Sequence, residues 1–213
     1  MKYLVVFLVF AMAEITIGEA IRCLQCKADG KSDCSGRSVT CPNKRDFCAK
    51  TVEENIANGK LIRTVSRRCL NESEACDKVT VATSTEYLLS LYNECCYKNN
   101  CNKGPIKMPK KKTRRNGYYC PSCFTVESNT CTGEHKQLPC TGNQRDCFVF
   151  IGKATLPGES EMEFYNAGCI TKGACDYIVT SVVGTEVDKA NSIIWCSSAH
   201  RERILRAMRG WGA

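Results

Sequence analysis

The sequence predicts a small, disulfide-rich, all-β protein built from two tandem domains. Three observations support this prediction: a high cysteine content, an N-terminal segment typical of secreted proteins, and a cysteine spacing that occurs twice. The chain of 213 residues contains 18 cysteines, close to the density that indicates a disulfide scaffold. Each repeat is too short to bury a large core, so we expect cross-links to stabilise it, chiefly by restricting the unfolded chain.

Residues 1–20 are predicted to be a secretory signal peptide. One basic residue precedes an apolar run that is shorter than the ~20 residues a membrane-spanning helix needs. Cleavage after Ala20 is favoured because Cys23 follows closely, and cleavage after Ala13 is the alternative. Secretion would place the chain in an extracellular, oxidising environment, where disulfides persist.

The motifs CLQC at 23–26 and CPSC at 120–123 are expected to be structural. In a cytosolic protein such pairs would suggest zinc or redox chemistry, but in a secreted chain each cysteine is expected to form a disulfide. Neither motif is followed by a second one at zinc-ribbon spacing, and the chain has only two histidines. We therefore expect no metal site and no cofactor.

The intervals between cysteines show an internal repeat. From Cys23 the numbers of intervening residues are 2, 7, 6, 6, 20, 6 and 18, and from Cys120 they are 2, 7, 8, 6, 21, 5 and 20. Seven successive intervals that agree within two residues indicate two copies of one module. The predicted parts of the mature chain are domain 1 (21–102), a basic linker (103–119), domain 2 (120–196) and a basic tail (197–213).

The long intervals contain sequences typical of β-hairpins. The stretch after Cys48, AKTVEENIANGKLIRTVSRR, has β-forming runs on both sides of Asn58-Gly59. The corresponding stretch after Cys147 contains Pro157-Gly158. Both dipeptides favour turns between strands. Each domain is therefore expected to consist of short hairpins that extend from a cysteine cluster.

The framework resembles the three-finger family, which includes snake neurotoxins, lymphocyte antigens and the urokinase receptor. The resemblance rests on CLQC at 23–26, the spacing through Cys76, and the terminal ECCYKNNCN at 94–102. Spacing alone does not determine connectivity, but the resemblance implies two tandem three-finger domains with no free thiol. Asn102 matches the closing asparagine that braces the cysteine cluster in this family, whereas domain 2 lacks this residue and the last bridge. The implied disulfides are Cys23–Cys48, Cys26–Cys34, Cys41–Cys69, Cys76–Cys95, Cys96–Cys101, Cys120–Cys147, Cys123–Cys131, Cys140–Cys169 and Cys175–Cys196.

A narrower resemblance is to the gamma-type phospholipase A2 inhibitors, which are secreted proteins of two three-finger domains. It rests on NGYYCP at 116–121 and YNAGC at 165–169. It implies a binding protein that captures a secreted phospholipase A2 without covalent chemistry. In those inhibitors the segment before NGYYC is apolar and is thought to contact the enzyme, whereas here it is GPIKMPKKKTRR at 104–115.

The candidate contacts with a partner protein are the finger tips and this segment with the two tyrosines that follow it. Tyrosine suits an interface, although both tyrosines would alternatively pack between the domains. The individual candidates are Ile106, Met108, Pro109, Lys110, Lys111, Lys112, Arg114, Arg115, Tyr118 and Tyr119.

An alternative function follows from the distribution of charge. The chain has a formal net charge of +8, and residues 103–119 carry seven basic residues and no acidic residue. The run KKKTRR at 110–115 would attract an acidic glycan or receptor electrostatically, so the alternative is a soluble ligand or decoy. The same run is equally typical of a solvated linker, and its paired arginines would also suit proteolytic processing.

No catalytic function is predicted. Cysteines in disulfides supply no thiolate nucleophile. A serine–histidine arrangement would need His135 or His200, which lie in a polar stretch and in the tail and are expected to be solvated. The chain is therefore expected to act by binding and to contain no catalytic residue.

Two further features concern the surface. Asn71 begins an Asn-Glu-Ser sequence, which predicts N-glycosylation in a secreted protein. In the tail, Ile204, Met208 and Trp211 have helical spacing, but an isolated helix of this length is unstable. We expect a frayed tail and no lipid-anchor signal.

Overall fold

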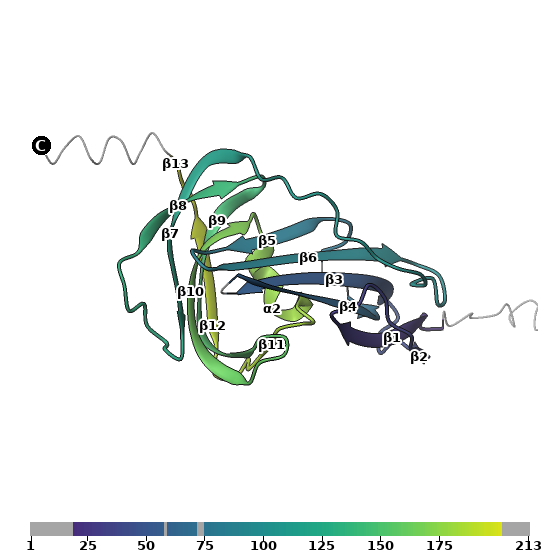
Figure 1. Ribbon diagram of the computed structural model, residues 1–213. Helices are drawn as coiled ribbons and strands as arrows, with labels where there is room; N and C mark the ends of the chain where they lie inside the picture. Colours follow the sequence, from purple (N-terminus) through teal and green to yellow (C-terminus); the bar gives the residue numbers. More distant parts are fainter. Residues whose placement is uncertain (1–18, 58, 72–74, 202–213) are drawn as a thin grey trace, which may run out of the picture.

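A computed structural model describes residues 19–57, 59–71 and 75–201, and these residues are mostly β-strand (Figure 1). The predicted all-β, disulfide-rich fold with two tandem domains is confirmed. Most of the predicted signal peptide, Asn58 of the first turn, Glu72-Ser73 of the glycosylation sequence, and the tail from 202 onward lie outside the described residues. Within the described residues, no helix is long and apolar enough to cross a membrane.

Domain 1 contains three antiparallel hairpins, which are the three fingers. Their strands are β1 (Arg22–Asp29), β2 (Arg37–Thr40), β3 (Phe47–Ala57), β4 (Lys60–Leu70), β5 (Val79–Thr83) and β6 (Tyr87–Cys96). In space the order is β5-β6-β3-β4-β1-β2. The β3–β4 register runs from Phe47↔Leu70 to Ala57↔Lys60, which places Gly59 in the turn with φ +77°. That left-handed conformation suits glycine.

Domain 2 repeats this plan up to its third finger. Its elements are β7 (Arg115–Val126), β8 (Lys136–Thr141), β9 (Gln144–Thr155), β10 (Glu161–Thr171), the 3-10 turn η1 (Ala174–Asp176), α2 (Ile178–Ser181), β11 (Glu186–Val187), β12 (Ile193–Ser198) and β13 (His200–Arg201). The strands pair in the order β12-β9-β10-β7-β8. From Ala174 onward the helical turns η1 and α2 stand where domain 1 has the first strand of its third hairpin, and they place Ile178 in the core.

Strands of domain 2 extend beyond its outermost cysteines, Cys120 and Cys196. Strand β7 begins at Arg115. At the other end, the short strand β13 pairs with β7 through His200↔Tyr119 and Arg201↔Tyr118. Pairing therefore continues beyond the outermost cysteines on both sides.

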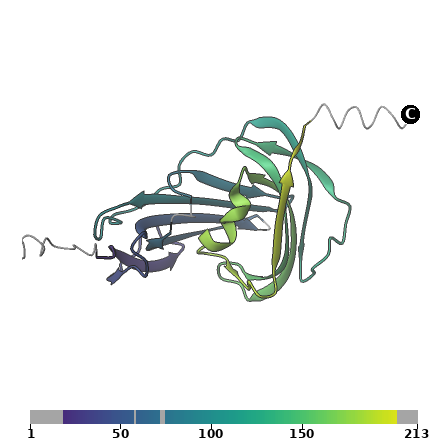
Figure 2. The same ribbon diagram turned by 180° about the vertical axis from the view of Figure 1, so that it is seen from behind.

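The two domains share one continuous sheet. Strand β5 of domain 1 pairs with β10 of domain 2 through Cys169↔Thr83 and Ile170↔Ala82. Figure 1 shows the long strands of domain 1 running across those of domain 2, and Figure 2 shows α2 between β12 and the strands of domain 1. The chain is therefore one body rather than two modules on a flexible linker.

The main hydrophobic core lies between the domains. Domain 1 contributes Tyr87 and Leu89, while domain 2 contributes Phe148, Phe164 and Ile178. Full burial of such a side chain contributes about 1.5–3 kcal/mol. Each module alone has little core, as expected, and the shared core compensates for this.

Nine disulfides hold the fingers together, and all 18 cysteines lie within the described residues and are paired. They join the same cysteines that the three-finger pattern implies. The bonds are Cys23–Cys48, Cys26–Cys34, Cys41–Cys69, Cys76–Cys95, Cys96–Cys101, Cys120–Cys147, Cys123–Cys131, Cys140–Cys169 and Cys175–Cys196.

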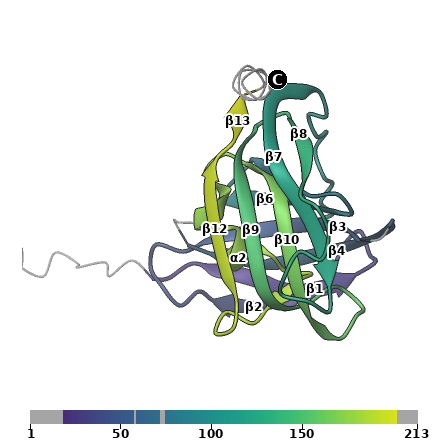
Figure 3. The same cartoon turned by 90° about the vertical axis from the view of Figure 1, so that its left-hand side faces the viewer.

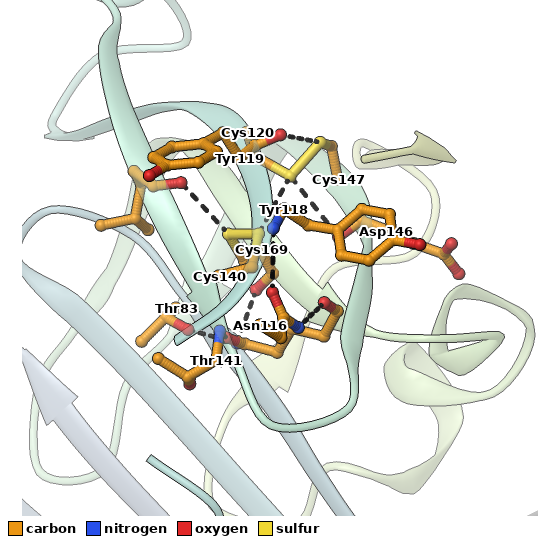
Figure 4. The surroundings of a disulfide bond; sticks show 12 residues. Thr83, Asn116, Tyr118, Tyr119, Cys120, Cys140, Thr141, Asp146, Cys147 and Cys169 are labelled. Carbon is orange, nitrogen blue, oxygen red and sulfur yellow. Dashed lines mark hydrogen bonds between the residues drawn. A yellow bond between two sulfur atoms is a disulfide. The ribbon is translucent and has the colours of Figure 1, made fainter. Parts of the chain in front are cut away.

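Asparagine side chains brace the base of each domain. In domain 1 the buried Asn102 accepts a hydrogen bond from the Leu24 N–H (3.0 Å) and donates to the carbonyls of Leu24 and Ala49. In domain 2, which lacks this residue, Asn116 donates to the carbonyls of Gly142 and Gln144 (Figure 4).

The sulfur atoms at the base of each domain are crowded. In domain 2 the disulfides Cys120–Cys147 and Cys140–Cys169 lie side by side, with 3.6 Å between the Sγ atoms of Cys120 and Cys140 (Figure 4). Three sulfurs in each domain lie within 4.8 Å of one another, a spacing that would suit a metal ion. Metal binding requires thiolates, so these oxidised sulfurs do not fit a metal site.

Candidate functional site

The apolar part of the predicted contact segment is packed into domain 1. Ile106 is only 4% exposed and packs against Val52 and Val65, and Met108 joins the same cluster. A partner would have to displace Ile106 from this core to touch it. Ile106 is therefore not available as a partner contact in this structure, because the hydrophobic effect holds its side chain against β3 and β4.

Lys111 also has a structural role in the linker. Its Nζ lies 2.9 Å from a carboxylate oxygen of Glu54 and 3.2 Å from the Ser90 hydroxyl. Glu54 pairs with Arg63 as well, at 2.7 Å. Burial alone would raise the pKa of Glu54, but the hydrogen bonds and positive charges of Arg63 and Lys111 hold it below its ordinary value. This ion-pair network ties the linker to β3.

The remaining linker candidates differ in exposure. Pro109 is half-buried, while the side chains of Lys110, Lys112, Arg114 and Arg115 are exposed. The basic side chains other than Lys111 are thus exposed, whereas Ile106 is buried and Met108 and Pro109 are half-buried.

The two tyrosines of NGYYC pack within domain 2. Tyr118 adjoins the cysteine cluster, and the guanidinium carbons of Arg145 and Arg201 lie 5.8 and 5.5 Å from its ring centroid. Arg201 Nε donates to the Tyr118 hydroxyl (3.1 Å), which lowers the pKa of Tyr118. Tyr119 lies beside it on β7, opposite Pro139 and His200. The alternative that Tyr118 packs between the domains is therefore wrong.

An exposed apolar surface lies elsewhere, on domain 2. Among the described residues, the large apolar side chains with substantial exposure are Leu61, Tyr97, Ile193 (62%) and Trp195 (49%). Two of these four lie two residues apart on β12. Because side chains alternate along a strand, Ile193 and Trp195 project from the same face.

Neighbouring strands extend this apolar surface. Trp195 lies opposite Val149 of β9, and Ile193 lies opposite Ile151. Tyr165 of β10 is in turn opposite Ile151. Residues directly opposite in antiparallel strands share a face, and Figure 3 shows this face of β12, β9 and β10 toward the viewer. We call these five residues the outer patch.

The alternate residues confirm which side the outer patch occupies. Ile194 and Phe150 pack against the core between the domains, and Phe148 is buried within it. The outer patch therefore lies on the opposite, solvent side of the sheet.

A hollow of about 450 Å³ adjoins the outer patch. Its lining includes Trp195, Val149 and Tyr165 of the outer patch together with His135 and His200. The His135 ring meets Tyr165 edge-on at 5.8 Å. Within the described part of the chain, neither histidine side chain makes a hydrogen bond. Both histidines are exposed.

The sequence contained only a weak signal for the outer patch. The stretches FVFIG and SIIW are apolar at successive positions, a pattern typical of strands that are buried on both faces. The pattern does not distinguish burial from an exposed apolar face, because both produce the same letters.

The tandem cysteine-braced fingers define a class of protein, the two-domain three-finger proteins. A model of the u-PAR/Ly-6 domain matches residues 19–104 and 116–197. Since these two copies cover most of the chain, this protein belongs to the u-PAR/Ly-6 family.

Several known proteins are similar to this chain over most of their length. Protein RoBo-1 of Rattus norvegicus is 24% identical over 177 residues, covering 83% of this chain and 72% of RoBo-1. Phospholipase A2 inhibitor LNF2 of Lachesis muta muta is 27% identical, covering 72% of this chain and 76% of the inhibitor. The phospholipase A2 inhibitor 31 kDa subunit of Naja kaouthia is 27% identical, with coverages of 83% and 92%. The predicted resemblance to phospholipase A2 inhibitors is thus confirmed.

Among solved structures, that of mouse TEX101 is 19% identical, with a TM-score of 0.35 and coverages of 82% of this chain and 97% of TEX101.

Proposed function

We propose that this protein is an extracellular binding protein that captures a secreted phospholipase A2 through the outer patch of domain 2. The observation that carries the proposal is the position of Trp195 and Ile193. An antiparallel sheet with one solvent face ordinarily presents polar side chains there. A contiguous apolar surface on a soluble protein is a common mark of a protein interface.

The composition of the outer patch suits an interface. Tryptophan and tyrosine are enriched among the residues that contribute most binding free energy, and the patch contains Trp195 and Tyr165. The next cross-strand pair is polar, Lys153 opposite Glu163. An apolar centre beside a polar rim is the usual anatomy of a protein interface.

The outer patch is also held rigid before binding. Trp195 immediately precedes Cys196, which is bonded to Cys175, and Val149 lies two residues after Cys147, which is bonded to Cys120. Strands fixed by disulfides lose little conformational entropy when a partner binds.

The similarity to two phospholipase A2 inhibitors supports the choice of partner. An enzyme that acts at a bilayer presents an apolar surface to the lipid, and an apolar patch on an inhibitor would complement it. Capture of that surface would keep the enzyme off the membrane. The proposal contains no chemical step, which agrees with the pairing of all 18 cysteines.

A titration tests this function. The mature chain, expressed in a secretory host, is added to a panel of secreted phospholipases A2, and binding and vesicle hydrolysis are recorded together. We expect saturable binding with a parallel loss of hydrolysis for at least one enzyme. Absence of binding across the panel would refute the assignment of the partner.

The alternative function, a soluble ligand or decoy for an acidic partner, is favoured by a different surface, the exposed basic side chains around the linker.

A further inference from the structure

A cleft of about 680 Å³ lies between the two domains, beside the linker. Its lining includes basic residues from four separate stretches of the chain. They are Lys78 before β5, Lys110, Lys111 and Lys112 of the linker, Arg145 of β9, and Lys172 after β10. The lining contains one acidic residue, Asp77. Folding therefore gathers positive charge that is dispersed in the sequence.

Most of these charges are not neutralised by the protein. Lys111 pairs with Glu54. In the described chain, no ion pair involves Lys78, Lys110, Lys112 or Lys172. Arg145 likewise has no carboxylate partner there, and it lies over the Tyr118 ring. A cleft lined by one sign of charge focuses the electrostatic field and attracts ions of the opposite sign.

We propose that this cleft binds a short segment of a sulfated glycan. Its volume lies in the range of sites for drug-sized ligands, about 300–1,000 Å³, and exceeds what one inorganic anion needs. Most of the positive charges are carried by lysines from separate stretches of the chain, and each lysine ammonium acts as a point charge. They suit several separate anionic groups along a ligand rather than one phosphate held by an arginine fork.

The neutral part of the lining also suits a sugar. Thr83, Thr113, Thr141 and Asn143 contribute hydroxyl and amide groups. Such groups donate to and accept from sugar hydroxyls. Val79 and Val81 add apolar groups to the lining.

The cleft differs from the linear run KKKTRR in a way that can be measured. Lys110 and Lys112 of this run line the cleft, whereas Arg114 and Arg115 do not. Conversely, Lys78 and Lys172 are remote from the run in sequence but line the cleft. A non-specific charge run and a built cleft therefore predict different residues for the same ligand.

The experiment measures the affinity of the full mature chain for heparin-derived oligosaccharides by calorimetry at about 0.15 M salt. Two variants, each lacking two exposed positive charges, are compared: Lys78→Gln with Lys172→Gln, and Arg114→Gln with Arg115→Gln. We expect the cleft variant to bind about 25-fold more weakly, or about fivefold for each charge. The run variant should change by less than about twofold.

The variant Asp77→Asn should bind the oligosaccharide more tightly, a result that misfolding would not produce. Asp77 has φ +55°, a conformation that asparagine tolerates. Removal of this negative charge should strengthen oligosaccharide binding by about fivefold. Chemically desulfated heparin should not bind.

Three results would overturn the proposal. They are no binding of heparin oligosaccharide by the unaltered chain, equal weakening by the two double variants, and displacement of the oligosaccharide by polyglutamate at equal charge concentration. The last would indicate an acidic protein partner. The cleft shares no lining residue with the hollow at the outer patch, so oligosaccharide should not compete with a phospholipase, and the two proposals can fail separately.

Discussion

The carboxylate of Glu53 in domain 1 accepts a hydrogen bond of 3.0 Å from the backbone N–H of Gly184 in domain 2. The N–H groups of Val183 and Thr185 donate to the same carboxylate at 2.6 and 3.1 Å. Glu53 is fully buried, and burial of a carboxylate is tolerated only when its charge is compensated by such donors. This contact fixes the segment between α2 and β11 of domain 2 against β3 of domain 1.

Replacement of Glu53 by alanine should destabilise the protein by about 3 kcal/mol or more, because three backbone N–H groups, two of them buried, would lose their acceptor. Urea-induced unfolding with the disulfides intact measures this change. Glu94→Gln is the matched control, since Glu94 is partly exposed and pairs with Lys50; it should cost less than about 1 kcal/mol. Equal stability of Glu53→Ala and the unaltered chain would show that the contact contributes nothing.

Gly184→Ala should also destabilise the contact between the domains. A Cβ at this position would lie 2.5 Å from Thr64 Oγ1 and 2.8 Å from a Glu53 oxygen, so the loop must move away. We expect a loss of about 1–3 kcal/mol, as for other overpacked sites. Gly133→Ala, where a Cβ would meet nothing within 4 Å, is the control. Limited proteolysis should cleave Gly184→Ala faster than the control; equal rates would contradict the prediction.

Ile106→Ala tests whether the linker supports domain 1 or contacts a partner. Because Ile106 packs against Val52 and Val65, its truncation should cost about 2–5 kcal/mol of stability. Phospholipase binding should be unchanged when it is measured at a temperature well below the unfolding midpoint of the variant. Lys107→Ala, on the exposed neighbour, should affect neither quantity. Loss of binding without loss of stability would restore the linker as the contact.

The Glu54 network predicts a dependence of stability on pH. The pKa of Glu54 is lower in the folded protein than its ordinary value of 4.5. The ionised group therefore stabilises the fold above pH 4.5, and this contribution is lost as the pH falls through the lowered folded-state pKa. Thermal unfolding should show a smaller acid-induced loss for Glu54→Gln than for the unaltered chain. An identical pH profile for both proteins would argue against the network.

The cysteine spacing was sufficient to predict the fold class and the repeat, because disulfide scaffolds depend on few positions. The cysteine spacing was not sufficient to predict how the two domains pack against each other. Glu53 lies in the stretch TVEEN, whose two adjacent glutamates are typical of a strand exposed to solvent. Its burial depends on residues 130 positions further along the chain. No local signal reports such a contact.

The candidate site shows the same limit. Ile106 was a candidate contact because the corresponding apolar segment of the phospholipase A2 inhibitors is thought to contact the enzyme, yet here it packs on β3 and β4. Trp195 lies in an apolar stretch with no local sign of exposure, yet its strand β12 lies at the sheet edge and exposes one face. Burial of a single residue depends on which element covers it, and this is decided by tertiary packing.

The measurement that tests the central proposal most directly is phospholipase binding by a variant of the outer patch. Trp195→Ala combined with Ile193→Ser should bind the phospholipase at least about 30-fold more weakly than the unaltered chain, since central aromatic residues contribute about 2 kcal/mol or more. Leu61→Ser removes an apolar side chain of similar exposure from domain 1 and should leave binding unchanged. Retained affinity in the outer-patch variant, with loss of affinity in Leu61→Ser, would contradict the proposal.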